Sequence, residues 1–98
     1  MLLFKRKFLP AIRSGEKTQT IRLWKHRRMR AGQGSYVPGV GRVRITGVEQ
    51  VGLGDLTDAD ARLDGFPTAE ALREELGTIY GDQLNSGRRL YRVGFVVE

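Results

Sequence analysis

Alternation of hydrophobic and polar side chains predicts several strands in this chain. The clearest case is residues 42–50, where valine and isoleucine alternate with arginine, and Gly47 interrupts the alternation as a β-bulge would. Stretches rich in β-branched and aromatic residues favour strands elsewhere. The expected strands are residues 2–4, 18–24, 42–50 and 90–97, with a further short strand around Tyr36.

Apolar side chains three and four positions apart predict three short helices, at residues 8–14, 58–63 and 68–80. Gly15 follows the first helix as a natural stop, and Thr57 precedes the second as an N-cap. The glutamates of the third helix are expected on its solvent side. They are Glu70, Glu74 and Glu75.

The order of these elements is β-α-β-β-β-α-α-β, and the strands do not alternate regularly with long helices. This order favours an α+β fold with mostly antiparallel strands over a parallel doubly wound sheet. A small antiparallel sheet must protect its edge strands, and closure into a barrel removes them. We therefore expect a small, closed or nearly closed β-barrel with two to three short helices.

Length and composition limit the chemistry that this chain can perform. Its 98 residues suit one domain, residues 1–98, with a modest core. There is no cysteine and only one histidine, so disulfides, thiolate nucleophiles and multi-histidine metal sites are excluded. We expect no metal and no cofactor. No apolar run approaches a membrane span of about 20 residues, and no signal peptide is recognisable, so a cytoplasmic location is expected.

The positive charge is concentrated in one half of the sequence. The net charge is +6, but residues 1–50 hold 12 Lys/Arg against 2 Asp/Glu, whereas residues 51–98 hold 5 against 9. Such segregation favours a polyanionic partner, most commonly nucleic acid; the alternative is a basic face that only confers solubility. The basic arm, residues 25–30, is expected to contact phosphates, or else to be a solvated loop. Its cations are Lys25, Arg27, Arg28 and Arg30, and Arg42 and Arg44 are expected to extend the same face.

The segment Gly15-Glu16-Lys17-Thr18-Gln19-Thr20-Ile21-Arg22 combines a lysine, a threonine and an arginine with useful chemistry. A buried lysine can act as a base, a threonine hydroxyl can donate or accept, and an arginine can bind phosphate or a base edge. Strand alternation places Thr20, Arg22 and Trp24 on one face, where Trp24 could stack on a base. Lys17 shares a pocket with Thr20 only if it still lies in the turn. Taken alone, each of these residues also fits an ordinary role: a surface lysine, a strand threonine or a solvated arginine.

Four parts of the sequence, in this order, resemble the ASCH family, a branch of the PUA-like superfamily of small β-barrels associated with RNA. They are residues 9–22, residues 39–47, residues 53–61 and the triplet Asp64-Gly65-Phe66. The resemblance implies a cleft between the first helix, the motif strand and the loop at Asp64. It also implies that RNA, or a nucleotide-like ligand, occupies this cleft.

One branch of small ASCH proteins removes the acyl group from N4-acylated cytidine with a lysine, a threonine and a glutamate. The resemblance assigns these roles to Lys17, Thr20 and Asp64, although Asp64 is one methylene shorter than glutamate. Three functions therefore stay open: a module that binds RNA, single-stranded nucleic acid or a modified nucleoside; an amidohydrolase; and a ribonuclease or non-catalytic interaction module. The sequence does not indicate an oligomeric state.

Overall fold

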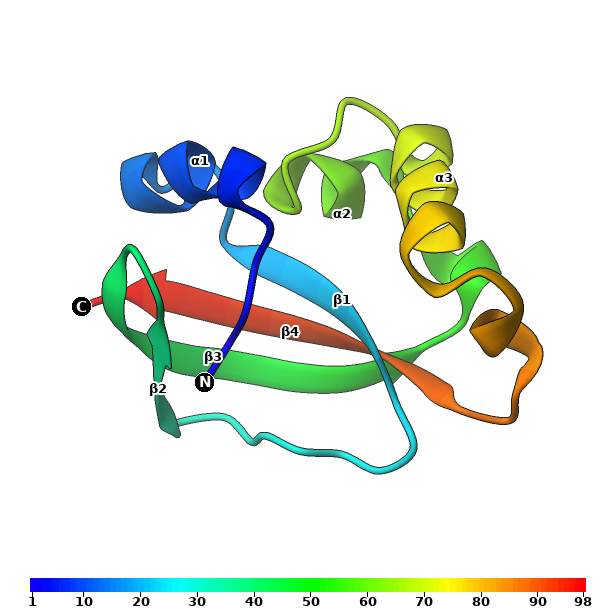
Figure 1. Ribbon diagram of the computed structural model, residues 1–98, viewed down its shortest axis with the longest axis horizontal. Helices are drawn as coiled ribbons and strands as arrows, with labels where there is room; N and C mark the ends of the chain where they lie inside the picture. Colours follow the sequence, from blue (N-terminus) through cyan, green and yellow to red (C-terminus); the bar gives the residue numbers. More distant parts are fainter.

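Four strands form one antiparallel sheet in the order β1-β4-β3-β2 in the computed structural model, which describes residues 1–98 (Figure 1). The strands are β1 (Gln19–Trp24), β2 (Gly34–Val37), β3 (Gly41–Val51) and β4 (Arg89–Val97). The α-helices are α1 (Leu9–Ser14), α2 (Asp58–Leu63) and α3 (Ala69–Tyr80), and short 3₁₀ turns lie at η1 (Arg6–Phe8), η2 (Leu53–Asp55) and η3 (Gly81–Asn85). The fold is therefore α+β, as predicted.

The sheet is not closed into a barrel, which corrects this part of the prediction of a closed or nearly closed barrel. β1 and β2 are its two edges and do not pair with each other. Other segments cover these edges instead: Thr18 N donates to Leu63 O at 2.9 Å beside β1, and Leu2 N donates to Tyr36 O at 3.0 Å beside β2. Covering an edge in this way protects its unpaired backbone groups without closure. The predicted strand at residues 2–4 is also wrong, because this segment is not part of the sheet.

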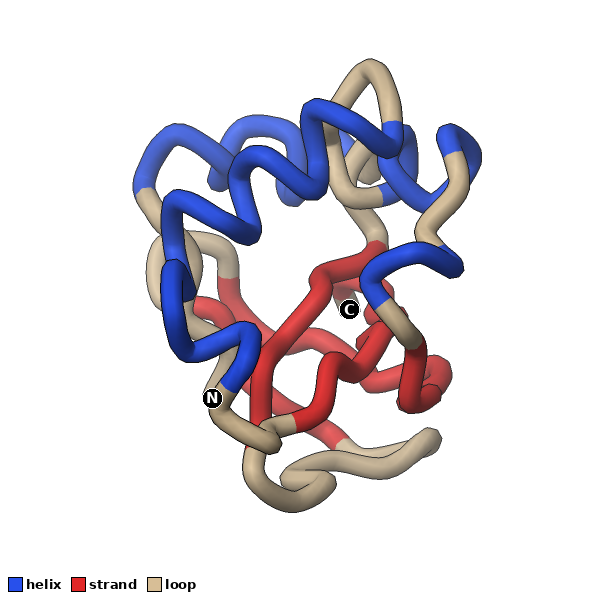
Figure 2. Tube along the Cα trace, turned by 90° about the vertical axis from the view of Figure 1, so that its right-hand side faces the viewer, coloured by secondary structure: helices blue, strands red, loops and turns tan.

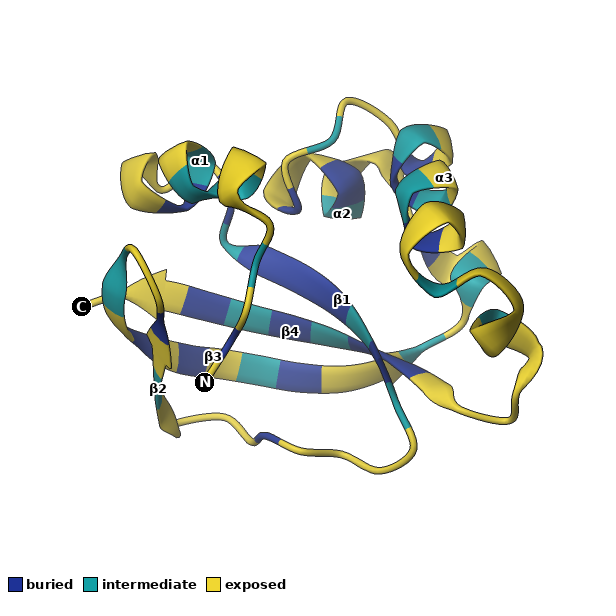
Figure 3. Ribbon diagram, viewed as in Figure 1, coloured by how far each residue is buried: buried dark blue, intermediate teal, exposed yellow.

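The helices gather along the β1 side of the sheet (Figures 1 and 2). Two buried clusters hold them there, and the burial colouring alternates along part of β3, whereas most of β1 is buried (Figure 3). One cluster packs Leu2 and Ile12 against Val93 and other residues of the central strands. The second packs α2 and α3 against the opposite face, which includes Leu90. None of the helices is long and apolar enough to span a membrane.

Local sequence signals explain most element boundaries. The Thr57 hydroxyl accepts a hydrogen bond from Asp60 N at 3.1 Å, and the Asp60 carboxylate accepts one from Thr57 N at 3.1 Å, so the predicted N-cap of α2 is confirmed as a capping box. The register of β3 against β4 shifts between Ile45 and Gly47, which confirms the predicted bulge. Gly15 ends α1 with a φ of 83°, a left-handed conformation that suits glycine.

Candidate functional site

Lys17 lies between α1 and β1, in neither element. After Gly15 turns the chain, Lys17 N donates to Ala11 O at 3.0 Å, which directs the lysine back beneath α1. Strand alternation therefore does not apply to Lys17, and it lines the same cavity as Thr20. The sequence analysis required Lys17 to lie in the turn if it was to share a pocket with Thr20, and Lys17 does lie there.

Lys17 forms a buried ion pair with Asp64, which caps the end of α2. Its ammonium donates to Asp64 Oδ1 and also to the backbone carbonyl of Asp64. Both residues are almost fully buried, with 2% and 3% of their surfaces exposed. Gly65 follows Asp64 with a φ of 91°, a left-handed conformation that suits glycine, and lies beside the lysine stem. Lys17 and Asp64, distant in sequence, thus act as one unit.

Three aromatic rings surround the Lys17 ammonium. Its Nζ lies 4.8 Å from the ring centroid of Phe8, 5.7 Å from that of Phe4 and 5.8 Å from that of Phe66. Phe8 and Phe66 also pack edge to face, with centroids 5.7 Å apart. The rings attract the cation electrostatically and exclude water from it.

Burial shifts the protonation equilibria of this pair. Burial lowers the pKa of Lys17, and the attraction of Asp64 offsets only part of this effect. Burial likewise raises the pKa of Asp64, and Lys17 again offsets only part. Both shifts favour the neutral form of each group, so Lys17 gives up its proton more readily than an exposed lysine. Asp64 Oδ2 is buried without a hydrogen-bond partner.

Arg22 and Thr20 form a second polar pair in the cavity. Arg22 Nε donates to Thr20 Oγ1 at 3.1 Å, and a terminal nitrogen of Arg22 donates to Leu3 O at 2.7 Å. Burial lowers the pKa of Arg22 as well. Because Thr20 Oγ1 accepts from Arg22, the hydroxyl hydrogen of Thr20 remains free to donate. No hydrogen bond joins Thr20 to Lys17, so the three residues to which the resemblance assigns catalytic roles do not form one hydrogen-bonded chain.

The cavity around these pairs has a volume of about 150 Å³. Its walls come from four parts of the chain: the N-terminal segment, β1, the loop after α2, and α3. The family resemblance implied the contribution of β1 and of the loop at Asp64, but not those of the N-terminal segment and α3. Besides the two polar pairs, the lining includes Leu3, Phe4, Lys5, Phe8, Phe66, Glu75, Ile79 and Tyr80. Tyr80 Oη accepts from Leu23 N at 3.3 Å, which leaves its own hydrogen free.

Glu75 corrects the prediction that the glutamates of α3 face solvent. Its side chain is only 14% exposed, and it accepts hydrogen bonds from Lys5 and Lys7. Helical spacing does indicate that Glu75 is partly buried. Leu72, Glu75 and Ile79 are three and four residues apart, so Glu75 lies on the same side of α3 as the two apolar residues. Its lysine partners lie about 70 residues away in sequence, beyond the reach of any local pattern.

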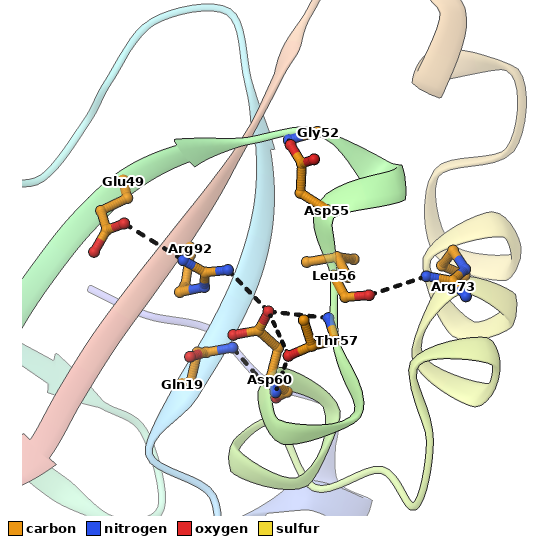
Figure 4. Close-up of polar contacts among 9 residues, drawn as sticks. All are labelled: Gln19, Glu49, Gly52, Asp55, Leu56, Thr57, Asp60, Arg73 and Arg92. Atoms are coloured by element: carbon orange, nitrogen blue, oxygen red, sulfur yellow. Dashed lines mark hydrogen bonds and ion pairs between the residues drawn. The ribbon is translucent and has the colours of Figure 1, made fainter.

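A polar network fixes α2, and hence Asp64, against the sheet (Figure 4). Arg92 of β4 donates to Asp60 Oδ2 at 2.8 Å and pairs with Glu49 at 3.4 Å. Gln19 Nε2 donates to Asp60 O at 3.3 Å. Although burial raises the pKa of Asp60, hydrogen bonds from the Thr57 N–H and from Arg92 lower it overall.

The other predicted binding residues lie outside this cavity. Trp24 packs on Tyr91, with ring centroids 5.4 Å apart. The cations of the basic arm are exposed in the loop between β1 and β2, and none of them forms an ion pair; they are Lys25, Arg27, Arg28 and Arg30. Arg42 and Arg44 line a separate depression near β2, where Arg44 pairs with Glu98 at 3.3 Å. The structure thus brings together Lys17, Thr20, Arg22 and Asp64 only.

The fold and the site define a small α+β domain with a buried Lys–Asp pair at the free edge of its sheet. No family model and no curated protein matches the sequence. Solved structures do match the fold. An ASCH domain from Lactobacillus crispatus is 16% identical, with a TM-score of 0.75 over 91% of this chain and 69% of that one.

Two further structures agree. A protein of the DUF984 family from Enterococcus faecalis is 18% identical, with a TM-score of 0.70 over 93% of this chain and 69% of that one. The hypothetical protein PH0355 is 14% identical, with a TM-score of 0.79 over 96% of this chain and 94% of that one. At these identities the similarity establishes the fold: the chain has the fold of an ASCH domain.

Proposed function

We propose that this protein binds one nucleobase, carried by a nucleoside or by single-stranded RNA, in the cavity around Lys17 and Asp64. The observation that carries the proposal is the cavity's combination of aromatic walls and buried polar groups. Its volume of about 150 Å³ corresponds to about five waters at about 30 Å³ each, which suits one heterocyclic ring better than a stretch of nucleic acid. Small-ligand sites generally combine apolar walls with a few placed polar groups.

Three polar groups of the cavity lining keep unused hydrogen-bonding capacity and would recognise the edge of such a ring. Asp64 Oδ2 has no partner and can accept a hydrogen bond. The hydroxyls of Thr20 and Tyr80 each accept from within the protein and keep a hydrogen to donate. Nucleobases present both donors and acceptors along one edge, and a base that is not stacked in a helix can offer that edge to a protein. An empty cavity leaves buried groups unpaired, so a ligand that pairs them gains affinity.

The basic arm would add affinity when the bound base belongs to a nucleic-acid strand. Its four cations have no acidic partner within the protein and are free to contact phosphates. Such contacts release counterions, are independent of sequence and weaken as salt rises.

A titration with cytidine and a short single-stranded RNA, followed by calorimetry at low salt, tests the proposal. Thr20→Val serves as the matched variant because it removes one hydroxyl at nearly constant volume. Loss of one such hydrogen bond should weaken cytidine binding by about tenfold. Absence of binding of either ligand to the wild-type protein would overturn the proposal.

A second candidate, hydrolysis of N4-acylated cytidine, is favoured by the lowered pKa of Lys17. A neutral lysine could accept the proton of an attacking water or of the Thr20 hydroxyl. In the overall reaction water adds hydroxyl to the acyl carbon and hydrogen to the N4 amine as the C–N bond breaks. An assay of N4-acetylcytidine should show turnover that Lys17→Ala abolishes, with folding checked by circular dichroism. No turnover, or turnover unaffected by the substitution, would reject this activity.

A further inference from the structure

The exposed residues among those lining the cavity show where a bound ligand would leave it. Lys17 and Asp64 form the floor, whereas Leu3 is 64% exposed and Ile79 45% exposed. The side chain of Lys5, also in the lining, is 52% exposed. The mouth of the cavity therefore lies between the N-terminal segment and α3. The sugar and phosphate of a bound nucleotide must leave the cavity here.

Two lysines of the N-terminal segment meet one carboxylate at this mouth. Lys5 Nζ lies 3.4 Å from Glu75 Oε1, and Lys7 Nζ lies 3.2 Å from Glu75 Oε2. Glu75 is the inner partner, with 14% of its side chain exposed, whereas the side chains of Lys5 and Lys7 are 52% and 57% exposed. An anion that approaches from solvent would thus meet the two ammonium groups first. We call Lys5 and Lys7 the rim lysines.

Glu75 makes this arrangement possible. Two ammonium groups would otherwise repel each other, and a shared carboxylate holds them side by side. Although burial raises the pKa of Glu75, the hydrogen bonds from Lys7 and Lys5 lower it overall, so this carboxylate stays ionised at neutral pH. Each ammonium has three donors, so donors remain for another anion after Glu75 is bound. The three groups together still carry a net positive charge.

We propose that the rim lysines, positioned by Glu75, form a phosphate subsite for a nucleotide whose base occupies the cavity. This inference rests on the proposed function and extends it to the chemical class of the ligand, a phosphorylated nucleoside. Lys5 and Glu75 line the cavity and Lys7 shares the Glu75 carboxylate, whereas no residue of the basic arm lines the cavity or contacts Glu75. The phosphate can belong to a free nucleotide or to an RNA strand, since both present the same group to the rim.

Calorimetry with three ligands tests the subsite: cytidine, cytidine 5′-monophosphate and a short oligocytidylate. We expect both phosphorylated ligands to bind the wild-type protein about tenfold more tightly than cytidine, because charge-assisted hydrogen bonds to phosphate are the stronger ones. An advantage confined to the oligocytidylate would assign the phosphate to an RNA strand, and an advantage of the mononucleotide would assign it to a free nucleotide.

The double variant Lys5→Gln/Lys7→Gln should lose the advantage of the mononucleotide over cytidine, with both ligands measured on the same variant. Arg27→Gln/Arg28→Gln is the matched control, since it also removes two cations and should keep that advantage. The inference is overturned if neither phosphorylated ligand has an advantage, or if the rim variant keeps the mononucleotide's advantage. If cytidine itself does not bind, the proposed function fails and the subsite fails with it.

Discussion

The cavity and the basic arm use positive charge in opposite ways. In the cavity, Lys17 is buried, paired with Asp64 and surrounded by aromatic rings. In the arm, the side chains of Lys25, Arg27 and Arg28 are exposed and have no acidic partner. A charge removed from water is costly unless it is paired, so the cavity cation is tied to the fold. An exposed charge costs the fold little and remains available to an external anion.

The largest difference should appear when one partner of the buried pair is removed. Lys17→Met leaves the Asp64 carboxyl buried without its cation, and removal of one partner of a buried pair typically costs 3–5 kcal/mol. We expect a loss of about 3 kcal/mol in the free energy of unfolding in urea, whereas Arg27→Gln should change it by less than about 0.5 kcal/mol.

The double variant Lys17→Met/Asp64→Leu provides the control for this prediction. Replacement of both charges by apolar groups removes the unpaired carboxyl, so it should recover most of the lost stability. Equal stability of Lys17→Met and the wild type would show that the pair does not hold the cavity together.

The second prediction concerns binding to single-stranded RNA, where the basic arm, not the buried pair, should have the larger effect. Arg27→Gln/Arg28→Gln removes two exposed cations, and each lost phosphate contact on a single strand reduces the slope of log K against log salt by about 0.7. We expect the slope for a short RNA to fall by about 1.4 in total, with cytidine affinity unchanged. The measurement is a set of fluorescence titrations between low and moderate salt. An unchanged slope would mean that the arm does not contact phosphates.

Sequence patterns predicted the elements well and the assembly less well. The strand at residues 42–50, its bulge at Gly47 and the capped helix after Thr57 all follow from local signals. The open sheet does not, because closure depends on which segments cover its edges. The shared pocket of Lys17 and Asp64 was suggested by a family resemblance and could not be derived from spacing.

Local patterns were also insufficient to identify the cations that lie beside the cavity. A run of charge at residues 25–30 is obvious in the sequence, whereas Lys5 and Lys7 gain significance only from Glu75, which the fold brings beside them. Charge density indicates a polyanionic partner, but it does not show which cations lie beside a cavity. That information comes from the tertiary structure.

A smaller effect concerns the stability of the protein in acid, to which Asp60 and Glu75 should contribute differently from Asp64. The pKa values of Asp60 and Glu75 are lowered in the folded protein, so their contribution to stability is full above their ordinary pKa values. It is lost as the pH falls through the lowered values. Asp64 has the opposite sign, because a raised pKa makes the folded state bind its proton more readily as the pH falls.

We therefore expect Asp60→Asn/Glu75→Gln to be less stable than the wild type at pH 7 and to lose less stability between about pH 5 and pH 2. Thermal unfolding at a series of pH values measures this difference. The Asp82→Asn variant, at an exposed position with no ion pair, should retain the wild-type profile. Parallel pH profiles for the double variant and the wild type would contradict the assignment.

The most direct test of the central claim is an NMR titration of the ¹⁵N-labelled wild-type protein with cytidine. If the cavity binds the base, the amide signals of Thr20, Ile21, Gly65 and Phe66 should shift in a saturable manner, and those of Arg27 and Arg28 should not. Shifts confined to the basic arm, or none at any residue, would show that the cavity around Lys17 and Asp64 does not bind the nucleoside.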